Sequence, residues 1–198
     1  MEILWLPPVA ALLLGYLLGS IPFGLLLAKA AGVGDLRKIG SGNIGATNVL
    51  RTGKKGTAAA TLLFDIGKGV AAVLVGMFLM DGGGVLGGAA AFFGHCYPVW
   101  LKFKGGKGVA TYMGIAMALH WPCGLIYAAV WLIALALLRY SSVGGMLAAI
   151  SAPVSAAAFT RFDLVPLFLG LTLIVLWKHS GNIMRLLTGT EPKVGKSH

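Results

Sequence analysis

Long apolar runs separated by short polar segments constrain this chain more than any other feature. A helix needs about 20 mainly apolar residues to cross a bilayer, and the sequence contains seven runs that we interpret as spans. They cover residues 3–28, 57–80, 85–101, 108–120, 122–139, 143–160 and 163–178. Of the 198 residues, 58% are hydrophobic and 11% are charged, whereas soluble domains carry about 25% charged residues. We predict an all-α integral membrane protein with seven transmembrane helices, forming a single polytopic membrane domain over residues 1–198.

The number of spans depends on the boundary between the fourth and fifth runs. The fourth run is short, and only Trp121 and Pro122 separate it from the fifth. A protein with five spans is therefore the alternative.

The positive-inside rule tests the count, because Lys and Arg concentrate in the cytoplasmic loops of membrane proteins. With the N-terminus outside, all but two of the 16 basic residues fall on the inner side. Arg161 faces outward, and Lys68 lies within a span. Glu2, Asp81 and Asp163 fall on the outer side. We therefore predict an external N-terminus and a cytoplasmic C-terminus, with every polar motif at the cytoplasmic face.

A net charge of +10 accompanies this hydropathy. In a membrane protein, such an excess indicates orientation and anionic ligands or lipids rather than nucleic acid. Cys96 and Cys123 lie in apolar surroundings, without a CxxC pair or a cluster of histidines. We expect buried, inert thiols and no metal site.

A short glycine-rich stretch, Gly40–Asn48, is the first candidate for ligand binding. Glycines let a backbone turn sharply and approach a ligand, while Ser, Asn and Thr add small hydrogen-bonding groups. The flanking basic residues are Arg37, Lys38, Arg51, Lys54 and Lys55. This mixture suits a phosphate, although a plain loop between two helices is the alternative. Its GxGxxG spacing does not indicate a dinucleotide site, because no βαβ pattern surrounds it.

The second candidate stretch, Lys102–Thr111, places lysines and glycines before the fourth apolar run. Its spacing is not that of a P-loop. Glycines at the start of a helix can expose N–H groups to an anion, whose charge the helix dipole favours, and Lys107 can reach a phosphate. The alternative is a basic inner loop that only follows the topology, with Lys102 and Lys104 facing lipid head groups.

The third candidate stretch, Lys178–Glu191, follows the last apolar run. In a helix, His179, Asn182 and Arg185 would share one face, because they are three residues apart. Histidine exchanges protons near neutral pH, asparagine can orient it, and arginine can bind a phosphate through two bonds. The alternative is a polar helix end at the membrane interface. We expect Glu191 to pair with a loop Lys or Arg in a structural role.

For other polar residues within the apolar runs we favour a structural role. Asp65 and Lys68 are three residues apart and can pair, which lowers the cost of burying either charge. We expect His95 to be a hydrogen-bonded core histidine, and we give His120 no role. Ser142, at the start of the sixth run, can cap a helix or contact a ligand.

Three motifs taken together resemble one family. GSGNIGATNVLR at 40–51, GGKGVAT at 105–111 and HSGNIMRLLTGTE at 179–191 are similar to the three motifs of the bacterial acyl-phosphate:glycerol-3-phosphate acyltransferases, the PlsY family. FDIGKG at 64–69 and GHCYPV at 94–99 fit as well, and the resemblance covers essentially the whole chain. Other glycerolipid acyltransferases carry a His-x4-Asp pair, which is missing here because no aspartate stands five positions after His95, His120 or His179.

The resemblance implies a reaction at the cytoplasmic surface of the bacterial inner membrane. An acyl group passes from acyl phosphate to the 1-hydroxyl of glycerol 3-phosphate, giving lysophosphatidic acid and phosphate. The resemblance implies no metal and no cofactor, and the partners are these small molecules and membrane lipid. We expect a monomer, although the sequence leaves the oligomeric state and the acyl-chain preference open.

The same resemblance assigns roles to individual residues. The catalytic residues are His179, Asn182, Ser41 and Arg51. The residues expected to bind substrate are Asn43, Thr47, Asn48, Lys104, Gly105, Gly106, Lys107, Gly108, Ser142 and Arg185. Either His179 or a substrate phosphate takes the proton of the attacking hydroxyl.

Two other classes of function fit part of the pattern. A transporter of anions or phospholipids would also place basic residues and helix ends around a phosphate, but usually near the bilayer midplane and often in repeated halves. Here the polar motifs gather at one face, and only Asp65 and Lys68 lie at depth. A lipid-binding scaffold is the third class, and it would not need His179 spaced with Asn182.

Overall fold

The computed structural model describes residues 4–195, and within that range the chain is helical and contains no strand. The predicted all-α class is therefore confirmed. Contacts between helices group the chain into two compact units, one ending at Leu119 and the other beginning at His120. Each unit is described by itself below. Glu2, which contributed to the predicted orientation, lies outside the described residues.

Unit 1 contains most of the helices. Its elements are α1 (Leu6–Gly19), α2 (Phe23–Ala30), the 3-10 helix η1 (Leu36–Lys38), α3 (Ala46–Leu50), α4 (Lys55–Leu79), α5 (Gly83–Cys96), the 3-10 helix η2 (Val99–Leu101) and α6 (Val109–Leu119). Pro22 interrupts the first apolar run between α1 and α2, because proline lacks an N–H and disfavours helical backbone before it. Pro98 has the same effect after α5, which therefore ends earlier than the predicted run to residue 101.

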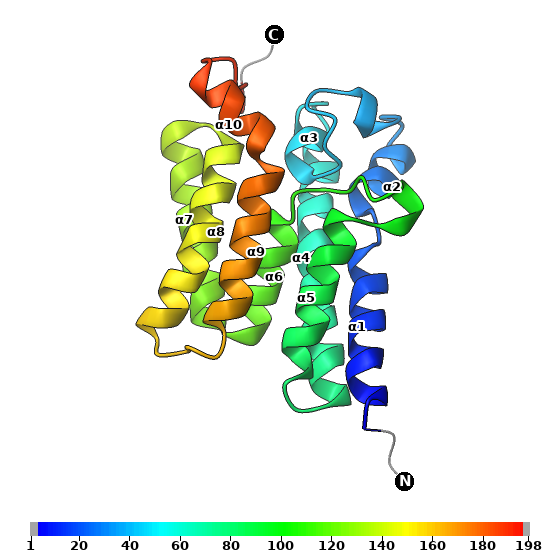
Figure 1. The fold of residues 1–198 in the computed structure, drawn as a ribbon. Coiled ribbons are helices and arrows are strands. Elements are labelled where there is room, and N and C mark those ends of the chain that lie inside the picture. The colour runs from blue at the N-terminus through cyan, green and yellow to red at the C-terminus, as the bar shows by residue number, and fades with distance from the viewer. Residues whose placement is uncertain (1–3, 196–198) are drawn as a thin grey trace. The chain divides into compact units, whose positions relative to one another are not determined.

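Helices of unit 1 pack through glycines that bring their backbones into contact. α5 lies against both α1 and α4 (Figure 1). A Cβ atom added to Gly19 of α1 would lie 2.0 Å from the carbonyl oxygen of Ala91 in α5, and one added to Gly15 would lie 2.4 Å from that of Gly87. Such close approach stabilises helix pairs in lipid, where the hydrophobic effect does not drive helices together.

Unit 2 consists of α7 (Trp121–Leu138), α8 (Ser141–Ala158), α9 (Val165–Lys178) and α10 (Ser180–Leu187). α8 packs against α7 and α9 (Figure 1). A bend of 55° separates α9 from α10. The chain after α10 returns to the turn between α7 and α8, where the Val194 N–H donates to the Arg139 carbonyl at 2.8 Å and Arg139 Nη2 donates to the Val194 carbonyl at 3.0 Å.

Four helical stretches are long and apolar enough to cross a membrane: Leu6–Ala30, Lys55–Leu79, Trp121–Leu138 and Ser141–Ala158. The bent pair α9 and α10 becomes a fifth if it counts as one span. α5 has 14 residues and α6 has 11, so at about 1.5 Å per residue each is shorter than a bilayer core of about 30 Å. The count of seven spans and the orientation of the termini stay predictions.

The contact between α1 and α5 predicts a specific loss of stability. Gly19→Leu should lower the free energy of unfolding by about 3 kcal/mol, because its Cβ atom would force the two backbones apart. Thermal unfolding of the purified protein in detergent measures this effect. Gly67→Leu is the matched control, since nothing lies within 4 Å of a Cβ atom at Gly67. Equal losses in the two variants would contradict the role given to close helix contact.

Candidate active site

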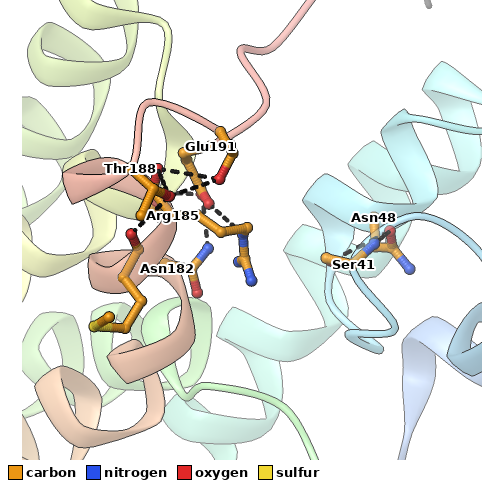
Figure 2. Close-up of polar contacts among 9 residues, drawn as sticks. Ser41, Asn48, Asn182, Arg185, Thr188 and Glu191 are labelled. Atoms are coloured by element: carbon orange, nitrogen blue, oxygen red, sulfur yellow. Dashed lines mark hydrogen bonds and ion pairs between the residues drawn. The ribbon is translucent and has the colours of Figure 1, made fainter.

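Asn48 organises the first polar stretch. Its side chain is 1% exposed, and its Nδ2 donates to the carbonyls of Leu36 at 3.0 Å and Ile39 at 2.9 Å. Its Oδ1 accepts from the Ser41 N–H at 3.1 Å and from the Ser41 hydroxyl at 3.4 Å (Figure 2). These four bonds use the full capacity of a side-chain amide. Asn48 therefore shapes the loop, and this contact pattern does not favour the predicted substrate contact.

Other predicted residues of this stretch surround Asn48. Gly40 has a positive φ of 54°, and a Cβ atom there would lie 2.5 Å from Asn48 Oδ1 and 3.5 Å from Arg51 Cδ. The tight turn at Gly40 thus lies against the aliphatic part of the Arg51 side chain. Ser41 and Arg51 are exposed, while Asn43 and Thr47 are half-buried. Unit 1 therefore brings Ser41 and the aliphatic part of the Arg51 side chain close to the same loop.

The glycine-rich stretch before α6 folds back onto the end of α5. The Gly106 N–H donates to the His95 carbonyl at 3.0 Å, and the Gly105 N–H donates to the Cys96 carbonyl at 3.2 Å. These two amides are not exposed, contrary to our expectation, because they satisfy carbonyls that the last turn of a helix leaves without partners. Any anion at this stretch must be bound by other groups.

The glycines of this stretch serve close packing instead. A Cβ atom on Gly106 would lie 2.1 Å from His95 Nε2, and one on Gly108 would lie 2.2 Å from the Phe92 ring. Gly108 also has a positive φ of 84°. Lys104 is exposed and Lys107 is half-buried. Lys107 lies two residues before the first residue of α6, at the end of the helix where the dipole favours an anion.

His179 lies at the bend between α9 and α10, where it caps α10 rather than belonging to it. The predicted shared helical face therefore holds for Asn182 and Arg185 alone. The His179 ring is 3% exposed, and its Nδ1 lies 2.8 Å from the Val175 carbonyl oxygen. A carbonyl only accepts, so Nδ1 carries the proton, and Nε2 of the neutral ring keeps its lone pair. This tautomer can accept a proton at Nε2.

Glu191 joins three predicted site residues of unit 2. Its carboxylate accepts hydrogen bonds from Asn182 Nδ2 at 2.7 Å and Arg185 Nε at 2.8 Å (Figure 2). It also accepts one from Ser142 Oγ at 2.6 Å. The predicted pairing of Glu191 with a basic residue is confirmed, although the partner lies in α10 and not in a loop. Ser142 was expected to cap a helix or contact a ligand, and the structure directs it to Glu191. The signal in the sequence is that Glu191 is the only acidic residue after Asp163.

The environment of Glu191 changes its acidity. Burial raises the pKa of this carboxyl, but the hydrogen bonds from Ser142, Asn182 and Arg185 outweigh burial and hold the pKa below its ordinary value. Glu191 is therefore ionised near neutral pH. The negative charge orients the amide of Asn182 and the guanidinium of Arg185.

The structural predictions for the remaining polar residues are also tested. Asp65 and Lys68 form the predicted pair, with 2.8 Å between Oδ1 and Nζ. Cys96 and Cys123 are buried, as expected, and they are not joined in a disulfide. Among residues 4–195, no group of three or more His, Cys, Asp or Glu side chains lies close enough to hold a metal ion.

The carboxylate of Glu191 should stabilise the folded protein. Glu191→Gln keeps the size of the side chain but removes the charge, so we expect a loss of about 2 kcal/mol in the free energy of unfolding near neutral pH. Thermal unfolding in detergent is the measurement. Asp163→Asn is the control, because its 2.7 Å pair with Arg161 is exposed and should contribute less than about 1 kcal/mol.

The contacts of Glu191 also predict how the stability difference between the parent and Glu191→Gln depends on pH. Because the pKa of Glu191 is lower in the folded than in the unfolded protein, its stabilisation is fully present above the ordinary value of 4.5 and is lost as the pH falls through the folded value. The difference in melting temperature between the parent and Glu191→Gln should therefore shrink as the pH falls below 4.5. A difference that stays constant over that range would contradict the ionised contact.

Comparison with known proteins places these features in a family. A sequence model described as glycerol-3-phosphate acyltransferase matches residues 9–189. A glycerol-3-phosphate acyltransferase of Mesorhizobium japonicum is 56% identical over 187 residues, which cover 94% of this chain and 96% of that protein. One of Zymomonas mobilis is 51% identical over 197 aligned residues, covering 92% of this chain and 93% of the relative.

Two solved structures have a similar fold. Both are crystal structures of PlsY, an integral membrane glycerol 3-phosphate acyltransferase, one in the glycerol 3-phosphate form and one in the lysophosphatidic acid form. The first has a TM-score of 0.88 and 36% identity, covering 95% of this chain and 96% of that chain. The second has a TM-score of 0.84 and 34% identity, covering 95% of each. The predicted location in a bacterial inner membrane follows, because this chain belongs to the glycerol-3-phosphate acyltransferase family of integral membrane proteins.

Proposed function

We propose that this protein transfers an acyl group from acyl phosphate to the 1-hydroxyl of glycerol 3-phosphate. The observation that carries the proposal is the state of His179, a buried imidazole whose Nδ1 bonds to the Val175 carbonyl at 2.8 Å. In a neutral ring this bond places the proton on Nδ1, so Nε2 is the atom that we propose as the proton acceptor. The similar PlsY structures are of a glycerol 3-phosphate form and a lysophosphatidic acid form. The first of these molecules is the acceptor of the proposed reaction and the second is its product.

The proposed reaction is a single displacement at the acyl carbon. The hydroxyl oxygen of glycerol 3-phosphate attacks the carbonyl carbon of acyl phosphate, and a new ester bond forms. The bond between that carbon and the phosphate oxygen breaks, and the phosphate leaves with the electron pair. The hydroxyl proton passes to His179 Nε2 or to an oxygen of a substrate phosphate. No covalent acyl-enzyme is needed, because acyl phosphate is already activated.

His179 and Asn182 are the proposed pair at the attacking hydroxyl. The Asn182 side chain is buried and donates to Glu191 at 2.7 Å, which fixes the orientation of its amide. Its side-chain carbonyl can then accept a hydrogen bond from the substrate, or from His179 Nε2 once that nitrogen has taken up the proton. Glu191 thus supports the pair without contacting the substrate.

Basic side chains are the proposed phosphate ligands. Arg51 and Lys107 would stabilise the leaving phosphate and the negative charge on the carbonyl oxygen. Ser41 would turn its hydroxyl proton away from Asn48 Oδ1, 3.4 Å from its Oγ, and donate it to a phosphate oxygen. Arg185 is a further ligand, because its bond to Glu191 uses Nε and the two terminal nitrogens point away from that carboxylate (Figure 2). The remaining proposed contacts are Asn43, Thr47, Lys104 and Gly108.

The membrane arrangement completes the proposal. Seven spans with an external N-terminus would bring the three polar stretches to the cytoplasmic face. There the phosphate groups of both substrates would lie at the aqueous surface, while the acyl chain stays in lipid. The chain would act as a single membrane domain and a monomer. The proposed reaction needs no metal and no cofactor.

The donor is tested directly by supplying one donor at a time. Purified protein with acyl phosphate and labelled glycerol 3-phosphate should form labelled lysophosphatidic acid without added coenzyme A or divalent metal. Thin-layer chromatography of the lipid extract measures the product. Product formed only from an acyl thioester would contradict the proposed donor. Uptake of label into protein-containing vesicles without any product would support a transporter instead.

Removal of the imidazole should reduce turnover. We expect His179→Ala to lower kcat about 100-fold or more, because a positioned proton acceptor contributes on this scale. Asn182→Ala should also lower kcat, and its melting temperature must be measured because Glu191 loses a partner. His120→Ala is the control, since His120 lies at the opposite end of α7 from the α7–α8 turn. Full turnover by His179→Ala would contradict its catalytic assignment.

A further inference from the structure

A buried group of three ionisable side chains lies in unit 1 and has no part in the proposed chemical step. Asp65 and Lys68 are in α4, and His95 is in the last turn of α5. Their exposed fractions are 3%, 5% and 5%. Charged groups within membrane segments are costly and are placed where they have partners. The contacts of this group therefore indicate what it does.

Lys68 connects the group to the interruption of the first apolar run. Its ammonium lies 2.8 Å from Asp65 Oδ1 and donates to the Ile21 carbonyl at 2.9 Å. Ile21 precedes Pro22, so its carbonyl lies where no regular helix continues. The ammonium also lies 5.8 Å from the centre of the Phe23 ring. Lys68 thus has defined partners on α4 and on the segment between α1 and α2.

Asp65 connects the same group to His95. The distance between Asp65 Oδ1 and His95 Nδ1 is 3.7 Å. This is an electrostatic contact rather than a hydrogen bond of ordinary length. One oxygen of Asp65 therefore faces both Lys68 and the imidazole, and it favours a ring orientation with Nδ1 directed toward α4.

The opposite edge of the His95 ring supports the glycine-rich stretch. A Cβ atom on Gly106 would lie 2.1 Å from Nε2 and 2.8 Å from Cε1. The Gly106 N–H donates to the His95 carbonyl at 3.0 Å. The same residue thus contacts Gly106 through its backbone and through its ring. Lys107 follows immediately in the sequence.

We propose that His95 is a positioning residue: the Asp65–Lys68 pair orients its ring, and the ring fixes the backbone at Gly106 so that Lys107 is held where the phosphate of glycerol 3-phosphate binds. This inference rests on the proposed function of the glycine-rich stretch. It explains why position 106 must be glycine, since the space of a side chain is filled by imidazole. His95 acts through Lys107 and does not contact the reacting atoms.

The test compares His95→Ala, Gly106→Ala and the double variant of the full chain. Affinity for glycerol 3-phosphate is measured without any acyl donor, from the rise in melting temperature that the ligand produces, and KM and kcat are measured with saturating donor. Each single variant should weaken binding about tenfold and raise KM, with kcat within about threefold of the parent.

The double variant separates positioning from general damage. Removing the ring creates room for the methyl group that Gly106→Ala introduces, so the double variant should bind no more weakly than the worse single variant. Independent effects would instead multiply to about 100-fold. Multiplied losses, or unchanged affinity in His95→Ala, would overturn the inference. Gly56→Ala is the matched control, since nothing lies within 4 Å of a Cβ atom there.

A second variant keeps the test decisive if His95→Ala does not fold. His95→Asn retains an amide that can face Asp65 and removes the ring atoms that face Gly106. It should weaken binding by a smaller factor than His95→Ala and should also suppress the defect of Gly106→Ala. Weak binding together with no suppression would overturn the inference.

Lys107→Met distinguishes this inference from the proposed function. If Lys107→Met leaves the affinity for glycerol 3-phosphate unchanged, the glycine-rich stretch does not bind the phosphate and both proposals about it fail. If Lys107→Met weakens binding but the His95 variants do not, only the positioning role of His95 fails.

Discussion

Backbone contact at glycines is the constraint on which the rest of unit 1 depends. α1 meets α5 where Gly15 and Gly19 leave no room for a side chain, and α4 meets α6 in the same way at Gly69 and Gly114. Lipid provides no hydrophobic force that would bring helices together, so close packing must supply the stability. The glycines of the stretch before α6 pack against the end of α5 in the same close way. The same residue type thus sets both the helix packing and the position of a candidate site segment.

Buried polar residues orient candidate site side chains in both units. Asn48 accepts the N–H and hydroxyl of Ser41, and Glu191 orients Asn182 and Arg185. In each case the supporting residue is buried and its bonds lie within its own unit. A side chain held in this way loses little conformational entropy when it binds a substrate, which is the benefit of preorganisation.

The sequence predicted what depends on neighbours along the chain. Hydropathy located the long helices, although Pro22 divides the first apolar run and Pro98 follows the early end of α5. The spacing of Asp65 and Lys68 predicted their pair because i,i+3 residues share a helical face. It did not predict that the N–H groups of Gly105 and Gly106 return to α5. These bonds form because the loop folds back onto the end of α5, and the pattern of residues along the loop does not indicate that fold.

The remaining differences also come from contacts distant in sequence. Ser142 and Glu191 are 49 residues apart, so spacing alone could not join them. The family resemblance assigned Asn48 to substrate binding, and only its burial and four bonds reveal that it also shapes the loop. The shared face of His179, Asn182 and Arg185 was predicted only for the case that this stretch is helical, and the bend between α9 and α10 places His179 at the N-cap of α10. A backbone bend of this kind has no clear signal in a stretch of Ser and Gly.

The central claim is that all three polar stretches face the cytoplasm, and labelling of single cysteines tests it most directly. Lys54, Lys104 and Ser180 are exposed; Lys54 lies shortly after the first stretch, and the other two lie within the second and third. Cys96 and Cys123 are buried. Each of the three is changed to cysteine in turn and treated with a membrane-impermeant maleimide in membrane vesicles of known orientation. All three should react in inside-out vesicles and be protected in right-side-out vesicles. Reaction of any two from opposite sides would show that the stretches cannot serve one site.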